Sequence, residues 1–392
     1  MSDSAKPYDI IVFGASGYTG RLVAEYLNQE YGASNLRWAM AGRSLDKLAA
    51  VRAELGIPDA IELVEVDADS AASVAAMVDA TRVVITTVGP YQLYGEELVK
   101  QCAERGTDYV DLTGEPNWMH QTIARYSDAA KASGARIVHS CGFDSIPFDL
   151  GVLFLQEQAI ATTGTPIATV KGRVRAMVGS FSGGTIASMR ATMAAVQANP
   201  EVIQVLTNPF ALTEGFTGAD QPTGAVVQYD EELSSWSAPF VMAPINTKNI
   251  HRSNALLRHR YGEDFRYDEM MLTGDGEQGK ATAEYVAKDD SVGQSALQPG
   301  EGPSREEREN GNYDILFVGE NCRGELMMAS VQGDRDPGYG STSKMLAEAA
   351  MCLLEHPQLA SGGLWTPASA LGSTLIDRLQ AHAGLTFRIE RG

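Results

Sequence analysis

The first third of the chain alternates short apolar runs with longer stretches in which apolar residues recur every three or four positions. The apolar runs predict strands at 9–13, 36–41, 61–66, 83–87, 109–112 and 136–139. The stretches between them predict helices at 21–31, 45–55, 71–78, 96–105 and 118–133. Regular alternation of strand and helix is typical of a parallel, doubly wound sheet with right-handed crossovers. We therefore expect residues 1–147 to form a Rossmann-type α/β domain.

Beyond residue 147 the pattern changes. It predicts strands at 169–178, 267–272, 313–318, 325–331 and 385–389, and helices at 182–196, 341–354 and 368–381. Two of these strands, 313–318 and 325–331, form a predicted hairpin, and the polar segment 298–311 predicts an exposed loop. We expect a second α+β domain at 148–340 with a mostly antiparallel sheet, followed by a C-terminal segment at 341–392.

A glycine-rich turn, Gly14-Ala15-Ser16-Gly17-Tyr18-Thr19-Gly20, lies between the first strand and the first helix. Gly14 permits a tight turn, Gly17 lets a pyrophosphate approach the backbone, and Gly20 allows close packing of helix on strand. The helix N-terminus adds free N–H donors and a positive dipole. The turn therefore predicts a dinucleotide site; a plain strand-to-helix turn is the alternative.

The second strand leads into Gly42-Arg43-Ser44, with Lys47 one helical turn further on. Sites that prefer NAD place an acidic residue here to bind the ribose 2′-hydroxyl. A guanidinium instead matches the 2′-phosphate of NADP. Arg43, with Ser44 and Lys47, therefore predicts NADP(H); the alternative is a solvated surface arginine.

Two further strand ends carry candidate cofactor contacts. Asp67 follows the third strand and can bind the adenine amino group, whereas its neighbours Asp69 and Ser70 can instead cap the next helix. The turn Val88-Gly89-Pro90 follows the fourth strand and can approach the nicotinamide-side ribose, unless it is a plain structural turn.

Composition narrows the class of protein. The 392 residues have a formal charge of −19, which disfavours nucleic acid and anionic membranes as partners. We expect no leader peptide, because residues 1–7 are polar, and no transmembrane segment, because the most apolar later stretch, 150–155, is too short. We also expect no metal site, because the four cysteines are scattered without a CxxC pair. Free thiols indicate a cytoplasmic protein, with peripheral membrane or lipid association left open. A homodimer is the default expectation.

Eight stretches together resemble the saccharopine dehydrogenase-like oxidoreductases, and among them the bacterial trans-acting enoyl reductases. They are GASGYTG at Gly14, AGRS at Ala41, TVGPY at Thr87, DLTGE at Asp111, CGFDSIPFDLG at Cys141, SGGT at Ser182, DPGYGSTSKM at Asp336 and GGLWTPASAL at Gly362. The resemblance implies an NADP-binding Rossmann domain, an antiparallel second domain and a C-terminal segment that returns to the first domain. It also implies cofactor contacts at Gly14, Ser16, Gly17, Tyr18, Thr19, Gly20, Arg43 and Gly89.

The resemblance further implies NADPH-dependent reduction of an α,β-unsaturated acyl or polyketide thioester in lipid biosynthesis. The substrate would be a small molecule or a chain held on an acyl carrier or a polyketide synthase. One alternative is a saccharopine-type amino-acid (imine) dehydrogenase, for which Arg173, Arg175 and Arg190 are available to bind carboxylates. Another is a non-catalytic, lipid-associated NADP-binding protein.

Three residues are candidates for the catalytic step. Tyr91 and Tyr94 directly follow the fourth strand, and Asp144 lies in the loop after the sixth strand. Each can stabilise an enolate or deliver a proton. The alternatives are that Tyr91 packs on the cofactor and that Asp144 caps the helix near Pro147.

A basic island, His251-Arg252 and Arg258-His259-Arg260, stands out in this acidic chain. It can hold an anionic group of the substrate, such as the phosphate of a pantetheine arm. The alternative is a solvated helix face paired with acids such as Glu263 and Asp264.

Overall fold

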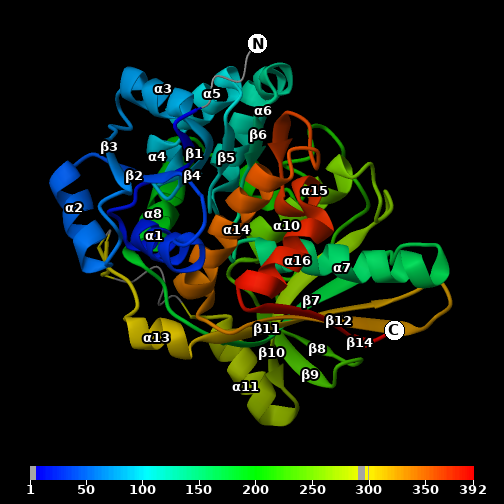
Figure 1. Cartoon of the computed structure of the whole chain (residues 1–392). Helices are drawn as coiled ribbons and strands as arrows, with labels where there is room; N and C mark the ends of the chain where they lie inside the picture. Colours follow the sequence, from blue (N-terminus) through cyan, green and yellow to red (C-terminus); the bar gives the residue numbers. More distant parts are fainter. Residues whose placement is uncertain (1–5, 290–295, 299) are drawn as a thin grey trace.

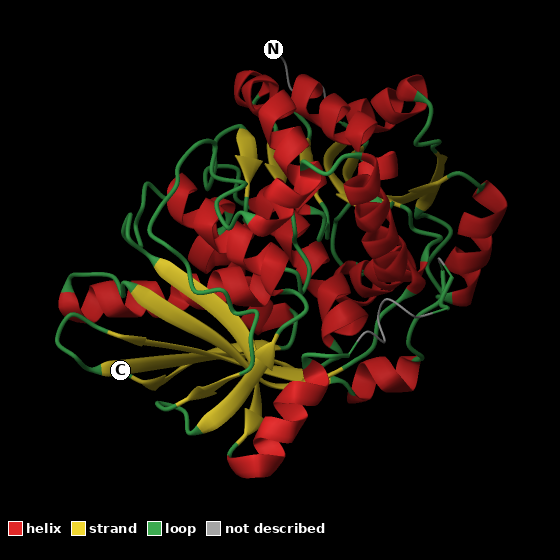
Figure 2. Ribbon diagram, turned by 180° about the vertical axis from the view of Figure 1, so that it is seen from behind, coloured by secondary structure: helices red, strands yellow, loops and turns green. Residues whose placement is uncertain are grey.

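The computed structural model describes residues 6–289, 296–298 and 300–392. It contains two seven-stranded sheets, each covered by helices (Figures 1 and 2). None of the described helices is both long and apolar enough to cross a membrane.

The first sheet is parallel throughout, with the strand order β13-β6-β5-β4-β1-β2-β3. Its strands are β1 (Tyr8–Phe13), β2 (Trp38–Gly42), β3 (Glu62–Glu65), β4 (Thr81–Thr86), β5 (Asp108–Val110), β6 (Arg136–Val138) and β13 (Gly363–Trp365). Its helices are α1 (Tyr18–Tyr31), α2 (Leu45–Glu54), α3 (Ala71–Ala80), α4 (Tyr91–Tyr94), α5 (Glu96–Arg105), α6 (Pro116–Ser133) and α14 (Thr342–Glu355). The predicted doubly wound domain is confirmed.

Both faces of this sheet are buried, which explains the continuous apolar runs in its strands. Ile10 and Val12 of β1 face one core together with α1, α2 and α14. Ile11 and Phe13 face the opposite core together with α3, α5 and α6. Side chains of one strand therefore alternate between two apolar layers.

The second sheet has the order β14-β12-β11-β7-β10-β9-β8 and is antiparallel except for the β7–β10 pair. Its strands are β7 (Thr169–Val178), β8 (Gln228–Asp230), β9 (Ser235–Pro239), β10 (Arg266–Gly274), β11 (Asn312–Glu320), β12 (Leu326–Gly333) and β14 (Leu385–Arg391). The helices that accompany these strands along the chain are α7 (Ile146–Thr163), α8 (Gly183–Ala198), α9 (Val202–Thr207), α10 (Ala243–Leu256), α11 (Gly276–Val286), α13 (Arg305–Asn310), α15 (Pro367–Ala370) and α16 (Gly372–His382), with a π-helical turn, η1 (Pro337–Ser341). Of these, α8 and α9 pack on α4 and α6 of the first domain. The predicted, mostly antiparallel sheet and its hairpin are confirmed.

The C-terminal segment contributes to both sheets. Strand β13 pairs with β6 of the first sheet, and β14 pairs with β12 of the second. Helix α14 packs on α1 and β4. The last fifty residues therefore connect the two sheets. Helix α7 connects them as well, because it lies between β6 of the first sheet and β7 of the second.

Two sequence-based predictions of secondary structure are wrong. The segment 298–311, expected to be a loop, contains α13, which starts with a capping box between Ser304 and Glu307. The helix expected at 368–381 is split into α15 and α16, because the chain turns at Leu371 and Gly372 has a φ of +52°.

Candidate functional site

The glycine turn between β1 and α1 has the geometry of a pyrophosphate cradle. Gly14 has a φ of +91°, and a Cβ on Gly20 would lie only 2.1 Å from the carbonyl oxygen of Gly14. Helix α1 therefore packs against the end of β1 at a distance that only glycine permits. Gly17 is the N-cap, and no side chain caps this end of α1 in the described structure. Its first N–H groups, at Tyr18 and Thr19, are thus available to an anion, so the turn fits the cofactor.

The end of β2 supplies cations beside this turn. Arg43 and Lys47 are exposed, and neither forms an ion pair with any described residue. Ser44 caps α2, since its Oγ accepts a hydrogen bond of 3.3 Å from the N–H of Lys47. The Ser16 hydroxyl lies near Gly42, where a Cβ would be 3.5 Å away. These positions fit a 2′-phosphate between Arg43 and Lys47.

The ends of β3 and β4 complete the expected cofactor edge. Asp67 is exposed, and its Oδ1 accepts a bond of 3.2 Å from the N–H of Asp69. Ser70, not Asp69, caps α3. The Val88 side chain lies beside the glycine turn, within 2.9 Å of where a Cβ on Gly14 would stand. Gly89 is exposed, and the buried Pro90 follows it through a cis peptide bond.

Tyr91 belongs to the core of the first domain. The residue is only 4% exposed, its ring stacks on Trp118 at 5.3 Å, and burial raises its pKa well above the usual value. Its hydroxyl donates to the Thr86 carbonyl (3.1 Å) and accepts from the N–H of Leu112 (3.3 Å). These contacts position α4, and they leave the hydroxyl poorly placed for proton transfer. Tyr94, by contrast, is 43% exposed.

Asp144 lies in the loop between β6 and α7. Ser145 is the N-cap of α7, and no side chain caps that helix, so the alternative of a capping Asp144 is not borne out. A Cβ on Gly114 would lie 3.4 Å from Asp144 Oδ2, which places this carboxyl against the loop after β5. Burial of the carboxyl raises the pKa of Asp144 to about 7.

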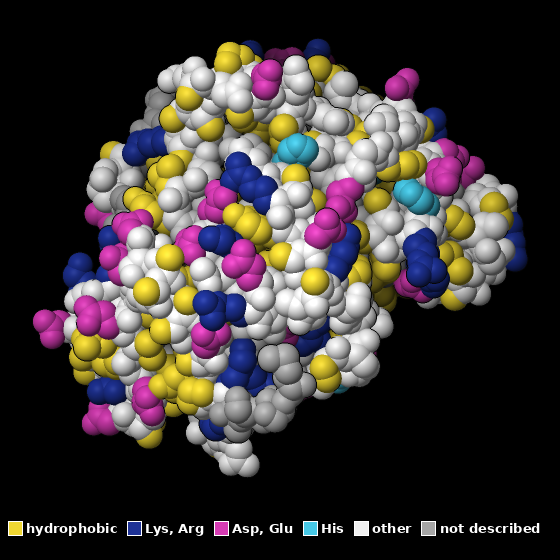
Figure 3. Space-filling model, turned by 90° about the horizontal axis from the view of Figure 1, so that it is seen from above, with side chains coloured by type: hydrophobic (Ala, Val, Ile, Leu, Met, Phe, Trp, Pro, Cys, Tyr) yellow, Lys and Arg dark blue, Asp and Glu magenta, His cyan; other side chains and the backbone are white. Residues whose placement is uncertain are grey.

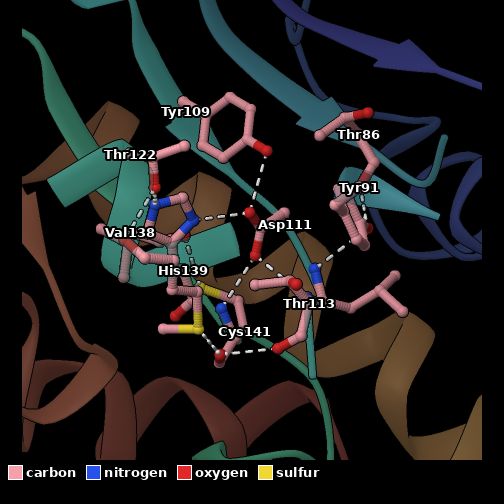
Figure 4. Close-up of polar contacts among 12 residues, drawn as sticks. Thr86, Tyr91, Tyr109, Asp111, Thr113, Thr122, Val138, His139 and Cys141 are labelled. Atoms are coloured by element: carbon pink, nitrogen blue, oxygen red, sulfur yellow. Dashed lines mark hydrogen bonds and ion pairs between the residues drawn. The ribbon is translucent and has the colours of Figure 1, made fainter. Parts of the chain in front are cut away.

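A buried polar network holds together the ends of β5 and β6, from which the loops that contain Gly114 and Asp144 continue (Figure 4). The Asp111 carboxylate accepts from the Tyr109 hydroxyl (2.8 Å) and lies 2.7 Å from Nδ1 of His139. Its other oxygen accepts from the N–H groups of Thr113 (3.0 Å) and Ser140 (2.8 Å). Asp111 thereby ties the end of β5 to the end of β6. The DLTGE motif was part of the family resemblance, but no role was predicted for its aspartate.

Two motifs far apart in the sequence meet at Tyr339, which the sequence analysis did not single out. Its hydroxyl accepts from the N–H of Ser182, at the start of α8, and lies 2.8 Å from Oγ1 of Thr185. Its ring packs edge-on against Tyr18 of the glycine turn, with centroids 5.1 Å apart. Tyr339 therefore joins the SGGT and DPGYGSTSKM motifs to the cofactor edge.

Glu269 of β10 is a second buried acid. Its carboxyl accepts from Asn246 Nδ2 (2.8 Å) and from the Tyr267 hydroxyl (2.8 Å). Burial and, to a smaller extent, the charge of Asp144 raise the pKa of Glu269 to about 8. Because no local motif surrounds Glu269, its burial was not predictable from the sequence.

The basic island is not one surface patch, contrary to the sequence-based expectation. His251 and Arg252 are buried, and Arg252 donates to the carbonyl of Leu364 (2.8 Å). Arg260 pairs with Glu157 rather than with Glu263 or Asp264. On the face shown in Figure 3, Lys and Arg side chains are likewise interspersed with Asp and Glu.

The arginines proposed for a dicarboxylate pocket are largely engaged within the protein. Arg173 is buried between Asp268 (3.1 Å) and Asp230 (3.5 Å). Arg175 pairs with Asp314 and Glu390. These ion pairs disfavour the saccharopine-type alternative.

Comparison with known proteins identifies the family. Residues 10–138 match the family described as Saccharopine dehydrogenase NADP binding domain. A Mycobacterium tuberculosis protein provisionally named as a trans-acting enoyl reductase is 38% identical over 100% of this chain and 99% of its own length. The trans-acting enoyl reductase of Mycobacterium bovis BCG is 35% identical over 97% of both chains. The fold is also similar to that of saccharopine dehydrogenase from Saccharomyces cerevisiae, with a TM-score of 0.57, 10% identity, and coverage of 97% of this chain and 99% of that one. The chain is therefore an NADP-dependent oxidoreductase of the saccharopine dehydrogenase-like family that includes the trans-acting enoyl reductases.

Proposed function

We propose that this oxidoreductase reduces the double bond of an α,β-unsaturated thioester. The observation that supports it most directly is Asp144, a carboxylic acid with a pKa of about 7 that lies in the loop after β6 and against Gly114 of the loop after β5, at the carboxyl edge of the first sheet. The similarity to trans-acting enoyl reductases over essentially the whole chain agrees with this chemistry.

Bound NADPH supplies a hydride to the β-carbon of the substrate, and negative charge develops on the thioester oxygen. Asp144 in its neutral form donates its proton to the α-carbon and is left as a carboxylate, which solvent reprotonates. A pKa near neutrality suits a group that must donate a proton and then recover it. Tyr94 is the remaining candidate for a hydrogen bond to the developing oxyanion.

The cofactor contacts follow the carboxyl edge of the first sheet. We assign the pyrophosphate to the backbone of the glycine turn and the 2′-phosphate to Arg43 and Lys47. The proposed contacts are Gly14, Ser16, Gly17, Tyr18, Thr19, Gly20, Arg43, Ser44, Lys47, Asp67, Val88, Gly89 and Pro90.

The experiment measures NADPH oxidation by the purified chain with enoyl thioesters of coenzyme A and of pantetheine, and NADP reduction with saccharopine. Asp144→Asn is expected to lower kcat by about 10²–10⁴-fold without changing NADPH affinity. In the unmodified protein, kcat falls as the pH rises through about 7, because the acid must be protonated. Asp69→Asn, an exposed acid near the same edge, is the matched control.

Turnover of saccharopine alone would contradict the proposal in favour of an amino-acid dehydrogenase. Tight NADPH binding without turnover of any thioester would favour a non-catalytic protein. The relatives' name also supports a substrate presented by a second protein, such as an acyl carrier or a polyketide synthase. The homodimer and association with a membrane surface stay predictions.

A further inference from the structure

The second domain reaches over the glycine turn through the segment that leads into α13 (Figure 1). Tyr18, the first residue of α1, donates its hydroxyl hydrogen bond to the carbonyl of Pro303. A Cβ on Gly302 would lie 2.5 Å from the Tyr18 ring, so the chain crosses directly above that ring. The start of α1 is therefore in contact with the other domain.

Arg308 of α13 lies at this contact. Its Nη1 donates to the Tyr18 hydroxyl (3.0 Å) and to the Pro303 carbonyl (2.8 Å). The guanidinium carbon is 5.8 Å from the centre of the Tyr18 ring. The side chain is half-buried, and within the described parts of the chain it forms no ion pair with a carboxylate.

Asp336, an acid that interacts electrostatically with this guanidinium, does not pair with it directly. Asp336 feels the charge of Arg308, which lowers the pKa of Asp336 although burial raises it overall. Its carboxylate oxygens are occupied by the N–H groups of Tyr339 (3.0 Å) and Gly340 (2.7 Å). Arg308 thus presents a positive charge next to the N-terminus of α1.

A pyrophosphate at this N-terminus carries two negative charges, whereas the helix dipole offers only about half a positive charge. The chain as a whole has a formal charge of −19, which opposes binding of an anion. Arginine matches phosphate oxygens through a planar fork of N–H groups. A cation beside the turn therefore supplies the complementary charge that the backbone alone lacks.

We propose that Arg308 is a ligand of the cofactor pyrophosphate, contributed by the second domain to the nucleotide site of the first. The bound cofactor would then contact both domains, the first through the glycine turn and the second through α13. The inference rests on NADP binding and is independent of enoyl reduction, so loss of the proposed activity does not touch it.

The test compares three variants, Arg308→Gln, Arg43→Gln and Arg305→Gln, by titration calorimetry with NADPH, NADH and adenosine 2′-phosphate. Arg308→Gln is expected to weaken NADPH and NADH alike, by roughly tenfold or more, because both contain the pyrophosphate. It should leave adenosine 2′-phosphate unaffected. Arg43→Gln should weaken NADPH and adenosine 2′-phosphate but not NADH.

Arg305 is the matched control: it lies on the same helix, is exposed, and pairs with Glu25. Its replacement should change none of the three affinities. Three results would overturn the proposal: unchanged affinities for Arg308→Gln, weakening of NADPH alone, or weakening of adenosine 2′-phosphate by the same factor, which shows a general structural effect. If Arg308→Gln does not fold, Arg308→Lys replaces it in the test. This variant keeps the charge and is expected to weaken the binding of NADPH and NADH by a smaller factor. Unchanged affinities, or an equal loss of affinity for adenosine 2′-phosphate, would overturn the proposal for this variant too.

Discussion

The glycine turn and the region around Asp144 are built in different ways. At the turn, a strand end, three glycines and a helix start lie within one short stretch of sequence, and backbone N–H groups form the site. Around Asp144, the chemistry comes from loops and strands far apart in the chain, including Glu269 and Tyr339. A site made of backbone is therefore encoded locally, whereas a site made of buried side chains depends on the packing of both domains.

The largest expected effect comes from removing the carboxylate that supports the Asp144 region. Asp111→Ala leaves the Tyr109 hydroxyl, His139 Nδ1 and two backbone N–H groups without their acceptor. We expect the free energy of unfolding to fall by about 3–5 kcal/mol. Urea unfolding measures it, with the exposed Asp128→Ala, expected to stay within about 0.5 kcal/mol, as control. A loss below about 1 kcal/mol for Asp111→Ala would show that the network contributes little.

The fold of the first domain could be predicted well from the sequence, and the reason is physical. Strand, glycine turn and Arg43 are read from neighbouring positions, and their geometry depends on short-range sterics. The hairpin of β11 and β12 and the helix that begins next to Ser182 were predicted for the same reason.

The region around Asp144, where the two domains meet, was predicted only in part. Asp144 was named, but its neighbour Glu269 was not, because a single buried acid in a strand has no periodic or spacing signal. The basic island misled the sequence analysis, since charge alone does not show that Arg252 is buried and bonded to the Leu364 carbonyl. Tyr91 was named for its position after β4, although its ring belongs to the core.

The next prediction concerns the glycine turn of the cofactor site. In Gly20→Ala the new Cβ would lie 2.1 Å from the Gly14 carbonyl oxygen, so α1 must move away from β1. We expect NADPH affinity to fall by about 100-fold or more, equivalent to roughly 3 kcal/mol. Gly164→Ala is the control, because a Cβ there would stand in open space, although Gly164, unlike Gly20, has a positive φ (+80°). Equal losses of affinity would mean that the close approach at Gly20 is unimportant for the site.

The last prediction concerns Glu269 and the pH dependence of the free energy of unfolding. Folded Glu269 keeps its proton up to about pH 8, whereas in the unfolded chain it ionises near its usual pKa of 4.5. Between those values the folded state binds more protons, so the free energy of unfolding falls as the pH rises. The neighbouring acids Asp144 and Asp268 add to this trend, since both raise the pKa of Glu269. Glu269→Gln keeps the volume and removes the titration, so its free energy of unfolding should decline less than that of the unmodified protein between pH 5 and 8. Thermal unfolding across this range provides the measurement, with Glu320→Gln at an exposed strand end as the control. Parallel pH curves for Glu269→Gln and the unmodified protein would show that the buried carboxyl is ionised throughout this pH range.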